Sequence, residues 1–264
     1  MRSIVSMKGG FGNQLFQYSF GEYLRQQGNR VWYDVSWYRS VPANDTLRSL
    51  NREIFGPGDT IFGSRVWWWA AKVLRRRQWW KIRINTERTA TPSNAWINVY
   101  EGYWQELQYA AVARTILTRR LIDNRGEAQV DAIGIHVRGG DYRSAINRAM
   151  FIECGREYYI NALQRLSVSD RSLPIYVFSD DREYCRHLLD GYLPNARVTY
   201  VKLQSDLDEW RLLARCQTVV IPNSTFSWWA AFLGQKPKRV ICPTRWRGDG
   251  DGASQLIPAD WISV

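Results

Sequence analysis

Apolar and polar residues alternate along the chain with two periods, and their order predicts strands and helices in turn. Short apolar runs bounded by turn residues indicate buried strands, and apolar residues spaced three or four apart indicate helices with one buried face. Strands are predicted at 4–7 and 31–33, on either side of a helix running from Leu15 to about Leu24. A strand at 99–104 and a helix at 107–117 follow. This opening order is typical of nucleotide-binding folds.

The alternation is clearer in the second half of the chain. The predicted strands are 132–137, 175–178, 198–201, 218–221 and 240–242, the last of which we expect to close the sheet. The predicted helices are 156–166, one that ends at Leu189, 207–214 and 225–233. Strands and helices at this spacing favour a parallel, doubly wound sheet. The polar stretch 123–131 predicts a linker, so we expect an N-terminal domain at 1–125 and a C-terminal domain at 126–264.

One strand runs directly into residues suited to binding an anion. The apolar residues 133–137 are followed by Arg138, Gly139, Gly140 and Asp141. An arginine can bind a phosphate through two hydrogen bonds, and adjacent glycines let the backbone approach a ligand closely. In an open α/β sheet, ligands bind at the carboxyl ends of the strands. The segment therefore predicts an anion site at the end of this strand.

Composition narrows the classes of protein that fit. The 264 residues are 45% hydrophobic, which indicates a globular chain, and the formal net charge of +11 favours an anionic partner: nucleic acid, a membrane surface or a phosphorylated substrate. The four cysteines form no CxxC pair and there are two histidines, so we expect neither a structural zinc site nor a disulfide framework. No apolar run spans a membrane, no signal peptide is recognisable, and we expect a cytoplasmic protein.

A basic, tryptophan-rich segment interrupts the pattern and predicts an insertion at about 62–88. Between Arg65 and Arg83 there are seven basic residues, five tryptophans and no acidic residue. Three interpretations are open: peripheral contact with an anionic membrane surface, a packed helical hairpin with a basic outer face, or nucleic-acid binding. The chain contains no recognised nucleic-acid motif, so no specific nucleic-acid partner is expected.

Four motifs resemble those of one enzyme family. Residues 9–18 (GGFGNQLFQY) are similar to the glycine-rich opening of the α-1,2-fucosyltransferases, glycosyltransferase family 11. Residues 136–141 are similar to the HxRRGD box of that family, residues 178–181 (FSDD) to its FSDD box, and residues 223–231 (NSTFSWWAA) to its NSTFSWWGA box. The motifs occur in the family's order and span almost the whole chain, whereas the resemblance is weak at 44–98.

The resemblance implies a fold and a reaction. It implies a GT-B type α/β fold, in which two Rossmann-like domains with parallel sheets face each other across a cleft, with the acceptor on the N-terminal side and the nucleotide-sugar donor on the C-terminal side. It also implies inverting transfer of L-fucose from GDP-β-L-fucose to the 2-hydroxyl of a galactoside, with no metal cofactor. The acceptor implied for bacterial members is an O-antigen or capsule glycan, in some cases lipid-linked, which would place the enzyme at the inner face of the plasma membrane.

The resemblance also assigns candidate residues. The candidate catalytic residues are Arg138, Asp141 and His136. The candidate substrate-binding residues are Gly10, Asn13, Gln14, Arg143, Ser179, Asp180, Asp181, Asn223, Ser224, Thr225, Ser227, Glu101 and Trp104. Structural interpretations stay open for most of them: a tight turn for the glycine loop, helix capping for the serines and aspartates, a buried structural role for His136, and a packed aromatic at Trp104. Trp228 and Trp229 are expected in the core.

One departure from the family pattern affects the functional prediction. The second arginine of the HxRRGD box is Gly139 in this chain. Without a metal, the departing diphosphate has to be neutralised by donors of the protein, so one missing arginine weakens the expected stabilisation. Arg143 is a candidate replacement. The alternatives are a different nucleotide-sugar donor or linkage, and a sugar-nucleotide-binding protein that has lost catalysis.

Overall fold

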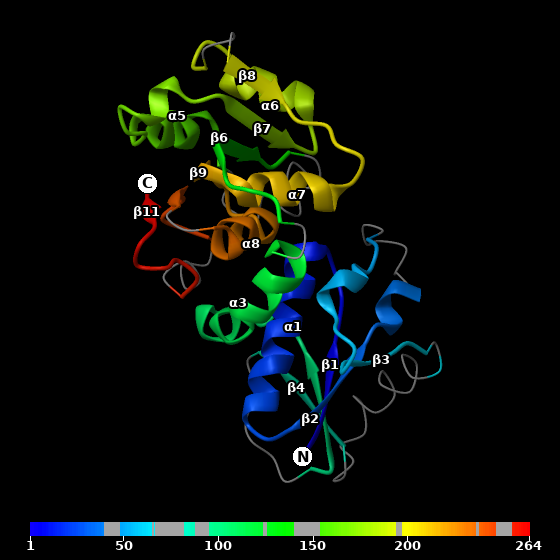
Figure 1. Ribbon diagram of the computed structural model, residues 1–264. Coiled ribbons are helices and arrows are strands. Elements are labelled where there is room, and N and C mark those ends of the chain that lie inside the picture. Colours follow the sequence, from blue (N-terminus) through cyan, green and yellow to red (C-terminus); the bar gives the residue numbers. More distant parts are fainter. Residues whose placement is uncertain are drawn as a thin grey trace. The chain divides into compact units, whose positions relative to one another are not determined.

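The chain divides into two α/β units, each with its own parallel sheet. The computed structural model describes residues 1–39, 48–64, 66, 82–87, 95–123, 126–139, 154–193, 197–235, 238–246 and 255–264 (Figure 1). The N-terminal unit is Met1–Leu121 and the C-terminal unit is Ile122–Val264. Among the described residues, no helix is both long enough and apolar enough to cross a bilayer.

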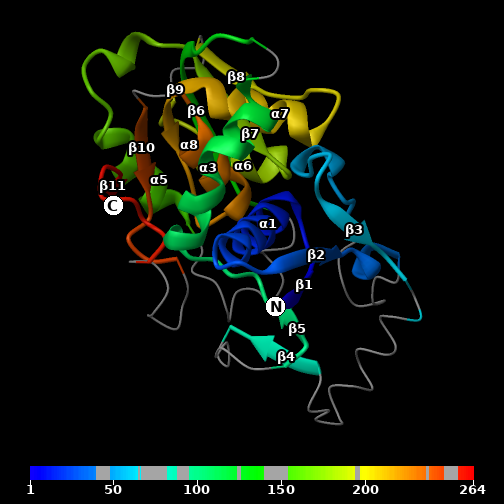
Figure 2. The ribbon, with the colours of Figure 1, turned by 60° about the horizontal axis from the view of Figure 1, so that its bottom comes forward.

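The N-terminal unit is built on a five-stranded sheet in the order β3-β2-β1-β5-β4. Its strands are β1 (Arg2–Ser6), β2 (Arg30–Asp34), β3 (Thr60–Phe62), β4 (Ile82–Thr86) and β5 (Ile97–Glu101), and every pairing is parallel. Helix α1 (Phe11–Gln26) packs against β1, β2 and α3 (Leu107–Leu121), as Figures 1 and 2 show. Short 3-10 helices lie at Ser36–Arg39 and Arg52–Ile54.

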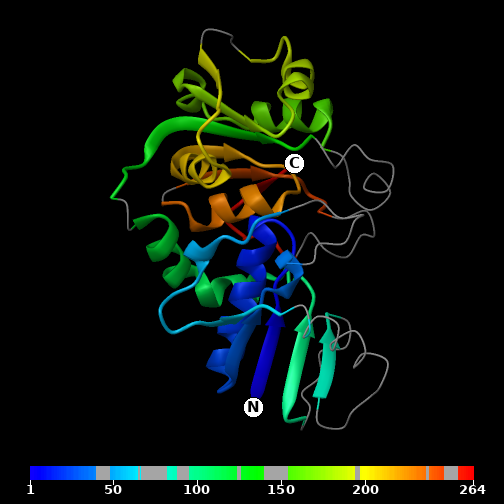
Figure 3. The same ribbon diagram turned by 90° about the vertical axis from the view of Figure 1, so that its right-hand side faces the viewer.

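The sequence pattern did not predict strands β3 and β4. Figure 3 shows β4 and β5 side by side, and the register pairs Ile84 with Val99. Residues 82 and 83 therefore lie in a strand of the sheet and not in a helical hairpin. Most of the remaining basic, tryptophan-rich segment lies outside the described residues.

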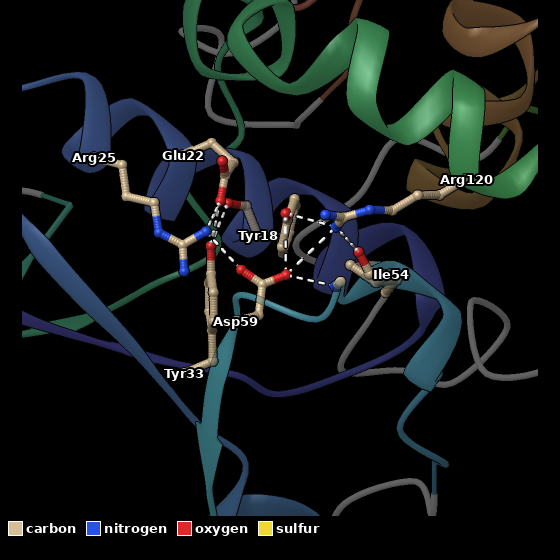
Figure 4. A network of polar contacts seen from close by, with 8 residues as sticks. Tyr18, Glu22, Arg25, Tyr33, Ile54, Asp59 and Arg120 are labelled. Atoms are coloured by element: carbon tan, nitrogen blue, oxygen red, sulfur yellow. Dashed lines mark hydrogen bonds and ion pairs between the residues drawn. The ribbon is translucent and has the colours of Figure 1, made fainter.

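A buried ionic network holds the first and last helices of the N-terminal unit together (Figure 4). The side chain of Asp59 is 2% exposed and accepts hydrogen bonds from Arg25 (2.5 Å), Arg120 (3.4 Å) and the Tyr18 hydroxyl (3.3 Å). Arg120, near the end of α3, also donates to the Tyr18 hydroxyl and to the Ile54 carbonyl oxygen, both at 2.7 Å. Arg25 also pairs with Glu22, whereas Asp59 is the carboxylate that the structure places beside both arginines, so their charges meet at this one buried group.

The C-terminal unit is built on a six-stranded parallel sheet in the order β11-β10-β9-β6-β7-β8. The strands are β6 (Val130–Val137), β7 (Ile175–Ser179), β8 (Val198–Tyr200), β9 (Cys216–Val220), β10 (Arg239–Cys242) and β11 (Ile262–Ser263). The helices are α5 (Arg156–Gln164), α6 (Arg182–Leu189), α7 (Asp206–Arg215) and α8 (Thr225–Leu233). The prediction that residues 240–242 close the sheet is wrong, because β11 pairs with β10 on its outer side.

In each sheet the strand that comes first in the sequence is internal, and the order in which later strands are added reverses beside it. In the N-terminal unit β2 and β3 lie on one side of β1, and β5 and β4 lie on the other. In the C-terminal unit β7 and β8 lie on one side of β6, and β9 to β11 lie on the other. Such a reversal opens a crevice at the carboxyl ends of the two diverging strands. The fold therefore marks two positions for ligands, one after β1 and β5 and one after β6 and β9.

Candidate functional site

The switch point of the C-terminal unit brings together two of the predicted motifs. The residues after β6 are Arg138 and Gly139, and those after β9 lead into α8 through Asn223 and Ser224. Because β6 and β9 are paired in the sheet, these two loops leave the same edge as neighbours. The structure thus joins two motifs that lie more than eighty residues apart in the sequence.

His136 lies buried near the end of β6. Its side chain is 6% exposed, its ring centroid is 5.6 Å from that of Phe226, and its carbonyl oxygen accepts from the Tyr159 hydroxyl at 2.9 Å. Among the described residues, no group hydrogen-bonds to Nδ1. Burial, together with the nearby Arg138 charge, lowers the pKa of His136 to about 3. The ring is therefore neutral at physiological pH and too weak a base for a general-base role, but it can hydrogen-bond to a ligand.

Gly139 is held where a larger residue would not fit. Its N–H donates to Oδ1 of Asp180 at 2.8 Å, so the loop after β6 is bonded to the residue that follows the neighbouring strand β7. A Cβ atom at this position would lie 2.6 Å from the Cβ of Asp181 and 3.4 Å from the ring of Tyr184. An arginine in place of Gly139, as in the family motif, is therefore incompatible with this backbone path. The glycine is adapted to its surroundings.

The FSDD motif supports this loop and the helix behind it. Asp181 is the N-cap of α6 and accepts the N–H of Tyr184 at 3.0 Å. Ser179 exchanges hydrogen bonds with the backbone of Asp181, at 2.9 and 3.1 Å. Asp181 thus fits the capping interpretation, whereas Ser179 holds the backbone of Asp181 and Asp180 holds the loop after β6.

The N-terminus of α8 presents a buried hydroxyl to the same edge. Ser224 is the N-cap residue and is 1% exposed, and its Oγ has no hydrogen-bond partner within the described part of the chain. Helix N-termini attract anions through their free N–H groups and the helix dipole. Ser227 donates to the Ser224 carbonyl oxygen at 3.3 Å, which supports a structural role, whereas Thr225 is half-buried. Trp228 and Trp229 are fully buried, which confirms their place in the core.

Three residues that were not predicted to belong to this site, Cys154, Tyr158 and Trp246, contact the loop after β9. Asn223 donates to the Trp246 carbonyl oxygen at 3.2 Å, and its Oδ1 lies 3.6 Å from the Cys154 thiol. The hydroxyl of Tyr158 donates to the Ile221 carbonyl oxygen and so fixes the start of the same loop. These contacts span between 23 and 69 residues, so no local motif could have revealed them.

The switch point of the N-terminal unit contains the glycine loop. Gly9 has a φ of +79°, which a side chain would strain, and Gly10 is the N-cap of α1. Gln14 is fully buried, donates to the carbonyl oxygens of Gly9 and Ser49, and accepts from the Asn51 N–H. Its amide is thus used within the protein, which supports the tight-turn interpretation for this residue.

Asn13 and the segment Glu101–Gln105 lie at this same edge. Asn13 is half-buried and accepts a hydrogen bond from Gln105 at 3.0 Å. Glu101, the last residue of β5, is half-buried. Trp104 is 2% exposed and stacks on Phe20 with ring centroids 4.0 Å apart, which supports its interpretation as a packed aromatic. Asp141 and Arg143 lie outside the described residues.

Comparison with known proteins identifies the family. The model of glycosyl transferase family 11 matches residues 4–251. An α-1,2-colitosyltransferase of Escherichia coli is 25% identical over 99% of this chain and 98% of its own length. A galactoside α-(1,2)-fucosyltransferase 1 of Mico humeralifer is 25% identical over 46% of this chain and 34% of its own.

The solved structures support the fold. The E. coli ADP-heptose lps heptosyltransferase II superposes with a TM-score of 0.50 at 12% identity, over 100% of this chain and 90% of that one. Its likeness and the two parallel α/β units confirm the expected GT-B fold class. With the family model covering nearly all of its length, the chain belongs to glycosyltransferase family 11.

Proposed function

We propose that this glycosyltransferase moves L-fucose from GDP-β-L-fucose to a hydroxyl of a glycan acceptor, with the 2-hydroxyl of a galactoside as the first candidate. The single observation that carries the donor side is the edge after β6 and β9. There the neutral ring of His136 and the hydroxyl of Ser224 are buried polar groups without partners among the described residues, and Arg138 follows His136 by two positions at the same end of β6. Buried polar atoms normally have partners, so an unpaired pair at a sheet's switch point favours a ligand that satisfies them.

The proposed reaction is a single displacement with inversion. The acceptor oxygen forms a bond to C1 of fucose as the bond from C1 to the diphosphate oxygen breaks, and GDP leaves with that electron pair. A carboxylate or the departing phosphate takes the acceptor proton. Arg138 and the N-terminus of α8 stabilise the negative charge on GDP, and we propose that they do so without a metal ion.

A second candidate donor is favoured by the relatives and by Gly139. The colitosyltransferase aligns along nearly the whole of this chain, whereas the galactoside fucosyltransferase aligns along about half. The space at Gly139 is closed to a second arginine, so the donor contacts differ from those of the HxRRGD pattern. A GDP-linked deoxysugar other than fucose, colitose included, is therefore the alternative.

The acceptor and its place in the cell form a separate proposal. We propose an O-antigen or capsule glycan acceptor, lipid-linked or free, a cytoplasmic location, and peripheral binding to an anionic membrane. The basis is the charge and tryptophan content of 65–83, most of which lies outside the described residues. Flotation with anionic vesicles at physiological salt tests the membrane contact, and absence of the protein from the floating fraction would refute it.

Donor discrimination is the deciding experiment. The protein is incubated with EDTA and, separately, with GDP-fucose, GDP-mannose, GDP-colitose, UDP-galactose and UDP-glucose. Each donor is tested with lactose, N-acetyllactosamine and lacto-N-biose. Release of GDP from GDP-fucose alone, with an α-linked product by NMR, supports the proposal. Release from GDP-colitose alone selects the second candidate, and GDP binding in calorimetry without release from any donor refutes both.

A further inference from the structure

A bulky residue in an unfavourable backbone conformation lies at the switch point of the N-terminal unit. Trp104 has a φ of +55°, and among the described residues it is the only non-glycine with positive φ. A large side chain rarely adopts this left-handed conformation, which persists where surrounding contacts enforce it and is concentrated at functional sites. The buried indole Nε1 of Trp104 also has no hydrogen-bond partner among the described residues.

One carboxylate enforces this conformation from a neighbouring strand. Glu87 follows the end of β4, and its Oε1 accepts the backbone N–H groups of both Tyr103 and Trp104, the second at 2.6 Å. Two N–H groups aimed at one anionic oxygen fix the backbone between them, because charge-assisted hydrogen bonds are short and directional. Glu87 lies outside all four family motifs.

The Glu87 side chain occupies the space that a side chain at residue 102 would fill, so Gly102 is needed for its position. A Cβ atom on Gly102 would lie 2.7 Å from Cγ and 2.9 Å from Oε1 of Glu87. The carbonyl oxygen of Gly102 accepts from the buried amide of Gln17 at 2.9 Å, so the glycine cannot move aside without breaking that bond. The segment is therefore held from two sides, by β4 through Glu87 and by α1 through Gln17.

The enforced turn places a polar and aromatic face beside the glycine loop. Gln105 donates to Asn13 at 3.0 Å, and the Lys8 ammonium lies 4.8 Å from the centroid of the Tyr103 ring. A Cβ on Gly9 would lie 3.4 Å from the Tyr103 ring and 2.9 Å from the amide of Asn13, so these groups close around a residue without a side chain. All five residues are half-buried. Amides, an ammonium and an aromatic ring together suit the hydroxyls and the apolar face of a sugar.

We propose that Glu87 is the positioning residue of an acceptor-sugar site formed by Tyr103, Gln105 and Asn13, acting through the strained backbone at Trp104. The inference rests on the proposed function, since it assigns the acceptor side of that reaction. Glu87 touches the backbone and not the sugar. Its loss therefore affects the affinity for the acceptor and leaves the donor site in the other unit unchanged.

The kinetic test uses the full chain with Glu87→Ala, Glu87→Gln and Gly102→Ala. Matched controls are Glu53→Ala, an exposed glutamate of the same unit, and Gly58→Ala, where an added Cβ meets nothing within 4 Å. For Glu87→Ala and Gly102→Ala, the KM for the galactoside accepted in the donor experiment should rise by roughly tenfold to hundredfold, the effect of a misplaced substrate contact. Glu87→Gln should restore about half of the loss on a logarithmic scale, because its amide oxygen accepts both N–H groups without the charge.

Two further readouts separate positioning from general damage and from failure of the proposed function. The KM for GDP-fucose and its slow hydrolysis without acceptor should stay within about twofold of wild type, since no donor contact changes. The NMR resonances of the Trp104 amide and the Gln105 side chain should shift on titration with methyl β-D-galactoside in wild type, and the shift should be lost in Glu87→Ala.

The outcomes are distinct. If wild type turns over no donor but methyl β-D-galactoside shifts both resonances, the proposed reaction fails and the sugar site stands. If turnover occurs while the acceptor KM of Glu87→Ala matches that of Glu53→Ala, the positioning role is overturned. Equal loss of acceptor affinity, donor affinity and melting temperature would also overturn it, because it would show a structural role alone.

Discussion

Restoring the family's arginine at Gly139 should damage this protein. An added Cβ would lie 2.6 Å from the Cβ of Asp181, closer than such atoms approach in folded proteins. The Cβ of Asp181 is bonded directly to the backbone and cannot rotate away, and moving that backbone would disturb the cap that its carboxylate forms on the Tyr184 N–H. The loop after β6 would have to move instead, and that movement would break the bond from the Gly139 N–H to Asp180. We therefore test Gly139→Ala and Gly139→Arg.

The expected cost follows from the contacts at risk. Loss of the Asp181 cap costs about 0.5–2 kcal/mol. Loss of a hydrogen bond to the charged Asp180 costs about 1.5–3 kcal/mol. Either the Asp181 cap or the Gly139–Asp180 hydrogen bond can break while the other is kept. Gly139→Ala should therefore lower the free energy of unfolding by about 2 kcal/mol. Gly139→Arg should cost at least as much and should reduce turnover.

Urea unfolding with a double-mutant cycle measures this coupling. Asp181→Gly removes the Cβ that would clash, and glycine caps helices nearly as well as aspartate. The double variant Gly139→Ala/Asp181→Gly should therefore lose less stability than the sum of the single variants, by about 1 kcal/mol or more. Gly58→Ala serves as the control for a glycine replaced in open space. Additive losses, or a Gly139→Arg variant with higher stability or turnover, would refute the steric argument.

The other predictions concern buried polar groups. Ser224→Ala should weaken GDP binding in calorimetry by roughly tenfold without lowering the free energy of unfolding, because the lost hydroxyl bonds no described protein group. Its control, Ser19→Ala, breaks a 2.8 Å hydrogen bond within α1 and should lower the free energy of unfolding while leaving GDP binding unchanged. Below pH 6.5 His136 takes up a proton in the unfolded chain but not in the folded chain, where its pKa is about 3. The free energy of unfolding should therefore fall by up to about 1.4 kcal/mol for each unit by which the pH is lowered, and His136→Gln should flatten that slope in urea titrations. Asp59→Asn should lower the free energy of unfolding by about 3 kcal/mol, since it leaves Arg120 without its carboxylate; a loss under 1 kcal/mol would contradict the role of that network.

The central strands and most helices could be predicted from the sequence because each has a strong local pattern. Helix α8 has the predicted bounds, Thr225–Leu233. Strand β3 has three residues, and β4 follows a stretch of arginines and tryptophans, so neither showed an apolar run. Their place in the sheet depends on pairing with β2 and β5, which a local pattern does not contain.

The candidate site shows the same limit at the level of single residues. The sequence showed that Gly139 lacks the family's arginine, but the atom that closes the space belongs to Asp181, 42 positions later. Gln14 was predicted to bind substrate because it lies in a motif, whereas its partners include Ser49 and Asn51. A motif thus identifies which residues matter, and long-range contacts decide whether each side chain faces a ligand or the protein.

The ionic network around Asp59 also determines how chimaeric enzymes have to be built from this fold. Arg120 is next to the last residue of the N-terminal unit, yet it bonds to Ile54, Asp59 and Tyr18, which come much earlier in the chain. A graft that joins this unit to the C-terminal unit of another family member must therefore place its junction after Leu121. A junction a few residues earlier would bring in a foreign α3 end and leave a buried carboxylate with one arginine. The two units can be recombined only when the whole of α3 stays with α1 and the Asp59 network that it contacts.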